Sequence, residues 1–387
     1  MSDSQDISYL GHTTHGRQHM RFGIKQLDRL LHTYVVGQTG VGKSSLLRLL
    51  AAQDATAGRG FALIDPHGDL VTELFQSVAS EQRERIIYLD ATNSTQPFGY
   101  NPLRRVRADK ISVAASGLLE TLRKLWPLAW GVRMEHVLRN TLYALIERDG
   151  SSLPDILRMY RDQAFRLHIA AGVRNPVVKA FWHDEFEQYH PRQQAEAVAP
   201  IQNKLSALLS DPTLYRVLVA PSIDLRFRRL MDEGNILLVN LSKGHLGEDS
   251  ALVLGSLLVS TVGLAALGRT DEAETARRPF HLYVDEFHNF TTLSFATMMS
   301  ELRKYGLGLT LAHQYLHQLD PAILHAVLGN AGTLIVFRAG AEDAPILAKQ
   351  LAPTFDERDI INLPNHQFYT RLLIDGAPSQ PFSGRLL

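Results

Sequence analysis

Residues 32–53 read HTYVVGQTGVGKSSLLRLLAAQ. An apolar run with β-branched residues comes first, a glycine-rich stretch follows, and a leucine-rich run closes the segment. This order predicts a strand, a loop and a helix. The loop, GQTGVGKS, fits the pattern G-x-x-x-x-G-K-[ST], in which glycines let the backbone wrap closely around phosphate groups. Successive N–H groups and the amino terminus of the following helix then face the anion.

The side chains of this loop have separate expected roles. Lys43 is expected to reach the β- and γ-phosphates, and the Ser44 hydroxyl is expected to bind Mg²⁺. The alternative interpretation is a glycine-rich turn with an exposed lysine. The predicted nucleotide-binding residues of the loop are Gly37, Thr39, Gly40, Val41, Gly42, Lys43, Ser44 and Ser45.

A second stretch, HLYVDEFHNF (281–290), ends an apolar run with two adjacent carboxylates, Asp285 and Glu286. Buried negative charges are costly unless a positive partner meets them. A phosphate-binding loop needs an acid that holds Mg²⁺, and ligands collect at the carboxyl ends of strands in open α/β sheets. Asp285 suits the metal, and Glu286 suits the water that attacks the γ-phosphate. The alternative is a helix cap, in which both side chains accept backbone N–H groups.

The stretch GLGLTLAHQ (306–314) predicts a further strand that ends at Gln314. An amide at that place can sense the γ-phosphate or the attacking water, and the alternative is an ordinary strand-end amide. With the loop and the acidic pair, it describes an ATPase with an added strand between the loop strand and the acidic strand. That is the RecA-like arrangement rather than the GTPase one, and no guanine-reading N/T-K-x-D motif occurs.

The remaining pattern divides the chain into three parts. Short apolar runs alternate with helical runs in the first and last parts, which indicates parallel strands with crossover helices. Helical periodicity dominates the middle part. The predicted fold is α/β, a RecA-like P-loop NTPase with a mainly parallel sheet flanked by helices and an inserted all-α subdomain. The expected parts are an N-terminal ATPase part with the P-loop (1–107), the all-α insertion (108–218) and a C-terminal ATPase part with the acidic and sensor strands (219–387).

Composition limits the class of protein. The 387 residues are 45% hydrophobic and 21% charged and include no cysteine, so disulfides and cysteine-based zinc sites are excluded. The formal net charge of zero argues against a basic outer face that coats DNA, but not against a ring with cations in its pore. The apolar stretch 251–268 is interpreted as a buried helix in preference to a membrane span. The N-terminus lacks the apolar region of a signal peptide, so the expected location is cytoplasmic.

The motifs and their order resemble the FtsK/HerA/VirD4 (TraD-like) superfamily of DNA-pumping ATPases. The resemblance covers about residues 20–385, and the most similar part is the soluble ATPase part of conjugative coupling proteins of type IV secretion, which has an all-α domain in the corresponding place. Membrane-bound coupling proteins carry N-terminal transmembrane helices, and no membrane segment is expected in this chain. Besides the loop and the acidic strand, the supporting stretches are FALIDPHGDL, YNPL, RMEHVLRN, LLVNLSKG, LRKYGLGLTLAHQYLHQL and FRAGAEDAPILAKQLAP.

The resemblance implies roles for two arginines. In this superfamily an arginine near the helix that precedes the glutamine strand reaches the γ-phosphate of a neighbouring subunit, and Arg303 occupies the matching position. Such an arginine stabilises transition-state charge and couples subunits, and the alternative is a solvated helix residue. Arg338, at the end of TLIVFR, is a second candidate for sensing phosphate, within the subunit or across to a neighbour. Its alternative is a structural ion pair with Glu342 or Asp343.

The resemblance also indicates where DNA would lie. Loops that face a central channel would contact it: the loop after LLVNLS with Lys243 and His245, and the all-α domain with Arg123 and Lys124. Sequence-neutral binding would use backbone phosphates and would depend strongly on salt.

The predicted function is an ATP-driven DNA translocase that hydrolyses ATP with Mg²⁺ and assembles as a homo-hexamer. The expected partner is DNA, and the sequence does not distinguish single- from double-stranded DNA. A protein partner is also expected: an effector, a relaxase or a secretion-system component. The alternative is a nucleotide-gated ATPase scaffold that recruits or regulates a nuclease-like or other effector without processive translocation.

Overall fold

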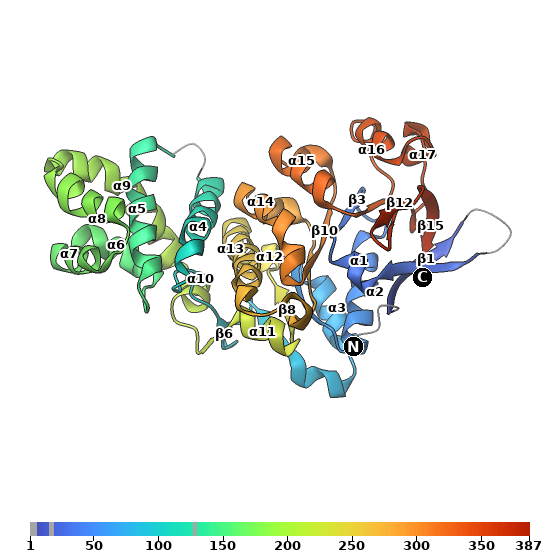
Figure 1. Ribbon diagram of the computed structural model, residues 1–387, viewed down its shortest axis with the longest axis horizontal. Helices are drawn as coiled ribbons and strands as arrows, with labels where there is room; N and C mark the ends of the chain where they lie inside the picture. The colour runs from blue at the N-terminus through green and yellow to red at the C-terminus, as the bar shows by residue number, and fades with distance from the viewer. Residues whose placement is uncertain (1–5, 15–18, 127–129) are drawn as a thin grey trace.

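The computed structural model describes residues 6–14, 19–126 and 130–387 and is built around one 11-stranded sheet (Figure 1). The strands from β11 to β5 run parallel, and the strands from β2 to β12 add an antiparallel extension. In spatial order they are β2 (Arg21–Lys25), β1 (Ile7–Thr13), β15 (Phe382–Leu386), β12 (Gln367–Arg371), β11 (Thr333–Val336), β3 (Thr33–Val36), β10 (Leu307–His313), β9 (Phe280–Val284), β4 (Gly60–Asp65), β8 (Ile236–Asn240) and β5 (Ile86–Asp90).

Helices cover both faces of the parallel part, as the continuous apolar strands require. Successive residues of a strand point to opposite faces, so Val35 packs in the layer of α2 (Lys43–Thr56) and α3 (Asp69–Ser77), whereas Tyr34 packs in the other layer. That other layer contains α11 (Phe227–Glu233), α13 (Glu248–Leu267), α14 (Leu293–Leu302) and α15 (Pro321–Asn330).

The strand order confirms the predicted RecA-like arrangement. β10 lies between β3, which leads into the P-loop, and β9, which leads into the acidic pair. Thr310 of β10 pairs with Thr33 of β3 on one side and with Tyr283 of β9 on the other. Because the three strands are parallel, their carboxyl ends meet at one edge of the sheet.

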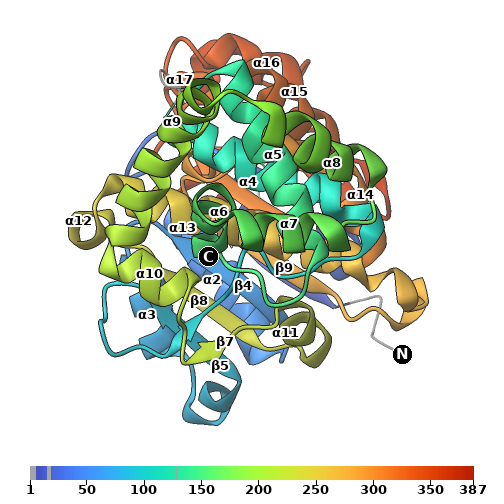
Figure 2. The ribbon, with the colours of Figure 1, turned by 90° about the vertical axis from the view of Figure 1, so that its left-hand side faces the viewer.

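An all-helical insertion projects from one side of the sheet domain (Figures 1 and 2). A two-stranded parallel ladder between β6 (Phe98–Gly99) and β7 (Ile223–Asp224) joins the chain before the insertion to the chain after it. The first helix, α4, packs on α13 and α14 of the sheet domain, and the later helices form an outer lobe. The helices are α4 (Ile111–Leu125), α5 (Val132–Glu147), α6 (Leu153–Arg161), α7 (Gln163–Gly172), α8 (Pro176–Ala180), a π-helix (Phe181–Glu185), α9 (Pro191–Ser210) and α10 (Pro212–Leu218).

Among the described residues, one helix, Glu248–Asp271, is long and apolar enough to cross a membrane by length and composition alone. Its apolar window is 72% buried inside the protein. It packs against α4, α11 and α14, so the prediction of a buried helix for 251–268 is confirmed.

The antiparallel extension of the sheet was only partly predicted. The last predicted strand is present as β12, but β1, β2 and β15 were missed. These strands alternate buried and half-exposed residues and therefore lack the continuous apolar run of the parallel strands. The remaining elements are α1 (Gln26–Arg29), α12 (Lys243–Leu246), α16 (Ala344–Leu351), α17 (Glu357–Ile361), β13 (Leu373–Ile374), β14 (Ala377–Pro378) and the short helices η1 (Ser80–Arg85), η2 (Ala108–Lys110), η5 (Phe186–Gln188), η6 (Gly268–Asp271), η7 (Glu274–Ala276), η8 (Phe287–Asn289), η9 (Arg303–Tyr305) and η10 (Leu316–Gln318).

Candidate functional site

The P-loop connects β3 to α2 and depends on glycine at two positions. Gly40 and Gly42 have φ angles of 77° and 119°, which side-chain-bearing residues rarely adopt. A Cβ at Gly42 would also lie 3.0 Å from Nδ1 of His366. The backbone N–H of His366 donates to the Val41 carbonyl at 2.8 Å, so the C-terminal segment holds the loop from outside.

Lys43 begins α2, and its side chain folds back under the loop. Its exposed fraction is 5%, and its Nζ donates to the carbonyls of Gly37 at 2.7 Å and Gln38 at 2.9 Å. Burial lowers the pKa of Lys43, and the negative charges of Glu286 and Asp285 oppose that change. The exposed lysine of the alternative interpretation is therefore not what this loop contains.

Ser44 and Asp285 meet at the carboxyl edge of the sheet. The Ser44 hydroxyl donates to Oδ2 of Asp285 at 3.2 Å. Burial raises the pKa of the Asp285 carboxyl to about 6, the nearby Glu286 and Asp65 add to this increase, and Lys43 opposes it. Burial and the neighbouring carboxylates therefore both disfavour the ionised form of Asp285 in this structure.

Glu286 lies between Asp285 and the sensor strand in a left-handed backbone conformation, with φ 47° and ψ 47°. Its Oε1 accepts a hydrogen bond from Nε2 of Gln314 at 2.7 Å, and Oε1 of Gln314 accepts one from the Thr39 hydroxyl at 2.8 Å. Gln314 thus connects the P-loop to the second carboxylate. Within the described residues, the other oxygen of Glu286, Oε2, is buried without a hydrogen-bond partner.

This arrangement differs from the helix-cap alternative. Asp285 does accept one backbone N–H, that of Glu286, at 3.0 Å. The Glu286 side chain caps no helix and points its Oε1 at Gln314 instead. The prediction that Lys43, Ser44, Asp285, Glu286 and Gln314 come together is matched by these contacts.

Arg338 lies beside the P-loop, on the side away from the acidic pair. Its Nε donates to the Gln38 side chain at 3.3 Å, and its Nη1 donates to the Leu363 carbonyl at 3.3 Å. The Arg338 carbonyl accepts the Gln38 N–H at 2.9 Å. None of the ion pairs found among the described residues joins Arg338 to Glu342 or Asp343, the partners of its structural alternative.

Arg303 lies away from this cluster. It begins η9, just before β10, whereas Gln314 follows the carboxyl end of β10. At about 3.3 Å per residue, the strand separates the two by roughly 20 Å. Arg303 is exposed, so it could act on a nucleotide only in the site of another subunit.

Two further polar residues, Asp65 and His288, lie near the site. Asp65 at the end of β4 is fully buried and accepts the backbone N–H groups of His67 and Val71, which fixes the turn into α3. His288 lies in η8 with its Nδ1 3.4 Å from Oε2 of Glu286. Its position two residues after Glu286 was a local signal that could have been used.

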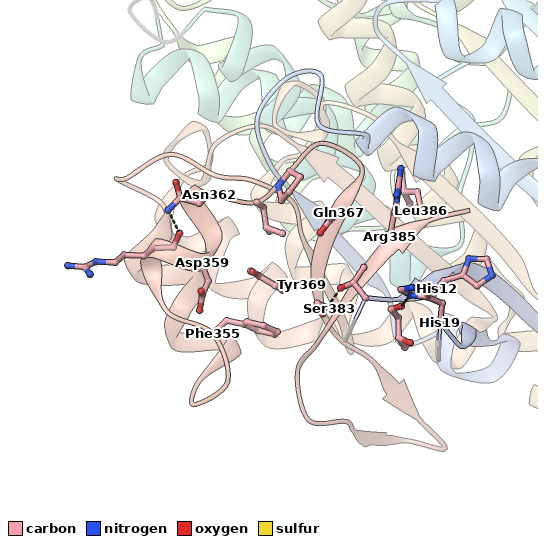
Figure 3. Close-up of a pocket in the computed structure, with 15 residues that line it drawn as sticks. His12, His19, Phe355, Asp359, Asn362, Gln367, Tyr369, Ser383, Arg385 and Leu386 are labelled. Carbon is pink, nitrogen blue, oxygen red and sulfur yellow. Dashed lines mark hydrogen bonds between the residues drawn. The ribbon is translucent and has the colours of Figure 1, made fainter. Parts of the chain in front are cut away.

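Two cavities lie on the side of the antiparallel strands, and one of them reaches the P-loop. One, of about 630 Å³, is lined by Ser45 of the loop and by His366, Arg385 and Leu386. The other, of about 970 Å³, shares Arg385 and Leu386 and extends between β12, β15, α17 and the N-terminal hairpin (Figure 3). Figure 3 shows Tyr369 and Ser383 on the strands between Asp359 of α17 and His12 of β1.

The fold and the geometry of the site define a RecA-like P-loop ATPase. The family model described as "Helicase HerA, central domain" matches residues 10–261, and the chain belongs to this family. A second model, described as "TraM recognition site of TraD and TraG", matches residues 279–360. With the solved structures below, these matches make the chain a P-loop ATPase of the FtsK/HerA/VirD4 type.

Solved structures with low sequence identity share the fold. The bacterial conjugative coupling protein TrwBdeltaN70 in its unbound form is 18% identical, with a TM-score of 0.65 over 94% of this chain and 87% of that chain. TrwB in complex with ADP and Mg²⁺ is 18% identical, with a TM-score of 0.64 over 99% and 95%. VirB4 of Thermoanaerobacter pseudethanolicus is 12% identical, with a TM-score of 0.64 over 100% and 97%. No curated protein sequence matches the chain.

Proposed function

We propose that the protein hydrolyses ATP with Mg²⁺ and uses the reaction to move or remodel DNA. The observation that carries the proposal is the connected set Thr39, Gln314 and Glu286 beside the Ser44–Asp285 pair. The likeness to TrwB, whose structures hold ADP with Mg²⁺ and an ATP analogue, supports the choice of nucleotide and metal.

The residues present fit a magnesium ion. The Ser44 hydroxyl and the Asp285 carboxylate are hard oxygen ligands 3.2 Å apart, which is the donor type that Mg²⁺ takes. Burial first, and then the nearby carboxylates of Glu286 and Asp65, raise the pKa of Asp285, and a divalent cation would favour its ionised form. Ser44 and Asp285 would hold the ion, and when bound it would neutralise negative charge that develops on the phosphates.

Each side chain then has one task. Lys43 leaves the carbonyls of Gly37 and Gln38 and donates to the β- and γ-phosphates, since the phosphates are stronger acceptors. Glu286 orients the attacking water and accepts its proton. Gln314 holds Glu286 on one side and Thr39 on the other, so it reports the state of the P-loop to the carboxylate.

The nucleoside has room on the side of the sheet away from Glu286. Phosphates on the P-loop would leave the ribose and base near Ser45, where the cavity of about 630 Å³ is lined by His366, Arg385 and Leu386. Arg338 contacts Gln38 of the loop on this side and could sense the phosphates within the subunit.

The action on DNA rests on the family and on the position of Arg303. An exposed arginine roughly 20 Å along β10 from Gln314 cannot serve its own subunit, but in a ring it can face the site of the next one. We propose a homo-hexameric ring in the cytoplasm, with DNA in its channel and a relaxase, secretion component or other effector as partner.

ATP turnover tests the proposal. Wild-type protein should hydrolyse ATP only with Mg²⁺ and faster with DNA, and the DNA effect should decline as salt rises. Glu286→Gln should lower turnover by about 10²–10⁴-fold while leaving nucleotide affinity unchanged, because it removes only the water-activating base. If Glu286→Gln hydrolyses ATP at the wild-type rate, the assignment of Glu286 is wrong. If DNA leaves turnover unchanged at every salt concentration, the translocase function is wrong and the nucleotide-gated scaffold is the better account.

Mixed assemblies test Arg303. Arg303→Ala should be inactive alone and should reduce turnover more than proportionally when mixed with wild-type subunits, because each variant subunit silences a neighbouring site. Glu301→Ala, an exposed neighbour on α14, is the matched control and should keep wild-type turnover. A strictly proportional dilution would contradict the role across subunits.

A further inference from the structure

The all-α insertion holds the chain segment that follows Glu286. Residues 287–294 run from η8 into the start of α14, and α4 of the insertion packs against them. Two side chains of α4, Glu120 and Lys124, make the polar contacts. They are four residues apart and therefore lie on one face of the helix.

Lys124 binds the carbonyl side of the segment. Its Nζ donates to the carbonyls of His288 at 2.6 Å, Asn289 at 2.8 Å and Thr291 at 3.2 Å. Burial, together with the positive charge of Lys243, lowers the pKa of Lys124 to about 8. Lys124 was predicted as a DNA contact, but all three hydrogens of its ammonium group are used inside the protein.

Glu120 binds the amide side of the same segment. Its Oε2 accepts the backbone N–H of Ser294 at 2.7 Å, and its Oε1 accepts the Ser294 hydroxyl at 2.8 Å. The Thr292 hydroxyl accepts the N–H of Phe295 and caps α14. Glu120 and Lys124 therefore fix both ends of a turn that would otherwise be held by few tertiary hydrogen bonds.

The fixed turn begins at the catalytic carboxylate. Glu286 has a left-handed backbone, which is unfavourable for a residue with a side chain and persists only where the surroundings impose it. Nδ1 of His288 and Oε2 of Glu286 are both buried, lie 3.4 Å apart and have no hydrogen-bond partner among the described residues. A small shift of the turn toward Glu286 would form a hydrogen bond between them, and a shift away would separate them further.

We propose that Glu120 and Lys124 are positioning residues through which the all-α insertion sets the orientation of Glu286. Displacement of α4 moves the turn 287–294, and the turn moves His288 against Glu286. A cavity of about 410 Å³ lined by Glu120, Lys124, His288 and Thr291 gives the turn space in which to move. The inference rests on the proposed role of Glu286 in hydrolysis and adds that the insertion regulates this role.

Hydrogen–deuterium exchange of the 387-residue chain tests the contact without reference to activity. In Lys124→Met, amides within 287–294 should exchange at least ten-fold faster than in wild type, while those of α5 and α9 should keep wild-type rates. Glu120→Gln, which keeps the shape of the side chain, should give a smaller increase in the same segment. Lys179→Met is the matched control, because Lys179 is an exposed lysine of the insertion far from the turn. Unchanged exchange of 287–294 in both variants would overturn the proposal.

Kinetics then test the effect on Glu286. Lys124→Met should lower kcat for ATP at least ten-fold with the Kd of an ATP analogue unchanged, and Lys124→Arg should recover part of the loss. Combined with Glu286→Gln, Lys124→Met should cause no further loss, because it acts through Glu286. A loss that is fully additive, or a loss in nucleotide affinity instead of kcat, would overturn the positioning role. If wild-type protein itself hydrolyses no ATP, the proposed function fails. The exchange experiment still decides whether Glu120 and Lys124 hold the turn 287–294.

Discussion

The two ends of β9 carry buried charge in opposite ways. Toward its amino end, near His281, Arg29 and Asp54 form a two-pronged ion pair at 2.7 Å and 2.8 Å. The hydroxyl of Tyr283, further along the strand, contacts both. Just beyond its carboxyl end, Asp285 and Glu286 lie near one buried cation, Lys43, whose ammonium group donates to backbone carbonyls instead. We call the first cluster complete, because Arg29 and Asp54 contact each other as opposite charges. The second is incomplete, because neither of its carboxylates forms an ion pair with a lysine or arginine among the described residues.

The pKa values report this difference. Arg29 holds the pKa of the fully buried Asp54 well below its usual range despite the burial. Burial without a contacting cation raises the pKa of Asp285 to about 6. A cluster that only stabilises the fold contains its own counter-charge, whereas a cluster built to bind a cation is left short of positive charge until the ligand arrives.

Breaking the complete cluster should have the largest effect. Asp54→Asn leaves Arg29 buried without a counter-charge, and removal of one partner from a buried ion pair costs about 3–5 kcal/mol of unfolding free energy. Urea unfolding at pH 7 measures this loss. Asp6→Asn, which removes an exposed partner of Arg59, is the control and should cost less than about 1 kcal/mol. A loss no larger than that of the control would mean that the pair does not stabilise the fold.

Neutralising the incomplete cluster should have the opposite sign. The carboxyl of Asp285 has a higher pKa in the folded protein than in the unfolded chain, so its ionised form destabilises the fold above about pH 6. Asp285→Asn should therefore raise the unfolding free energy of the nucleotide-free protein by about 1–3 kcal/mol at pH 7, at 1.36 kcal/mol per pKa unit. The gain should shrink as the pH falls below about 6 and should vanish only below about pH 3, where the carboxyl is protonated in both states. A destabilised Asp285→Asn at pH 7 would show that Asp285 is a structural carboxylate.

The pH dependence should also differ at the amino end of β9. Burial lowers the pKa of His281 to about 3, so unfolding takes up a proton between about pH 6.5 and pH 3, and stability falls as the pH drops through that range. His281→Leu should flatten the slope of unfolding free energy against pH by about 1.4 kcal/mol per pH unit near pH 5. Chemical denaturation at several pH values measures the slope. An unchanged slope would mean that His281 is not held neutral in the folded protein.

The connection between the P-loop and Glu286 should contribute least to stability. Gln314→Ala removes two side-chain hydrogen bonds near the surface of the site, at about 0.5–1.5 kcal/mol each at most. Its effect should instead appear as a several-fold lower kcat for ATP. If the variant keeps full turnover, Gln314 has no role in hydrolysis and is an ordinary strand-end amide.

The sequence was sufficient to predict the parallel sheet and to predict that Lys43, Ser44, Asp285, Glu286 and Gln314 lie together at its carboxyl edge. Each central strand is a continuous apolar run, and the P-loop, Asp285 and Gln314 follow such runs directly, so strand order alone brings them together. The charge cluster of Arg29, Asp54 and Tyr283 could not be predicted, because its members are far apart in sequence and only Tyr283 lies in a motif, one that points to its carboxylates. The same holds for Glu120 and Lys124, whose partners are backbone atoms of a distant turn. The left-handed backbone of Glu286 also has no local signal, since glutamate rarely adopts it.

The central claim is that the end of β9 is short of positive charge because it binds a magnesium–nucleotide complex. Calorimetric titration of the wild type and of Asp285→Asn with a non-hydrolysable ATP analogue, with and without Mg²⁺, tests this claim directly. We predict that Mg²⁺ tightens binding to the wild type by at least about ten-fold, or 1.4 kcal/mol, and leaves binding to Asp285→Asn nearly unchanged. Equal affinity of the wild type with and without Mg²⁺, or the same Mg²⁺ effect in both proteins, would contradict it.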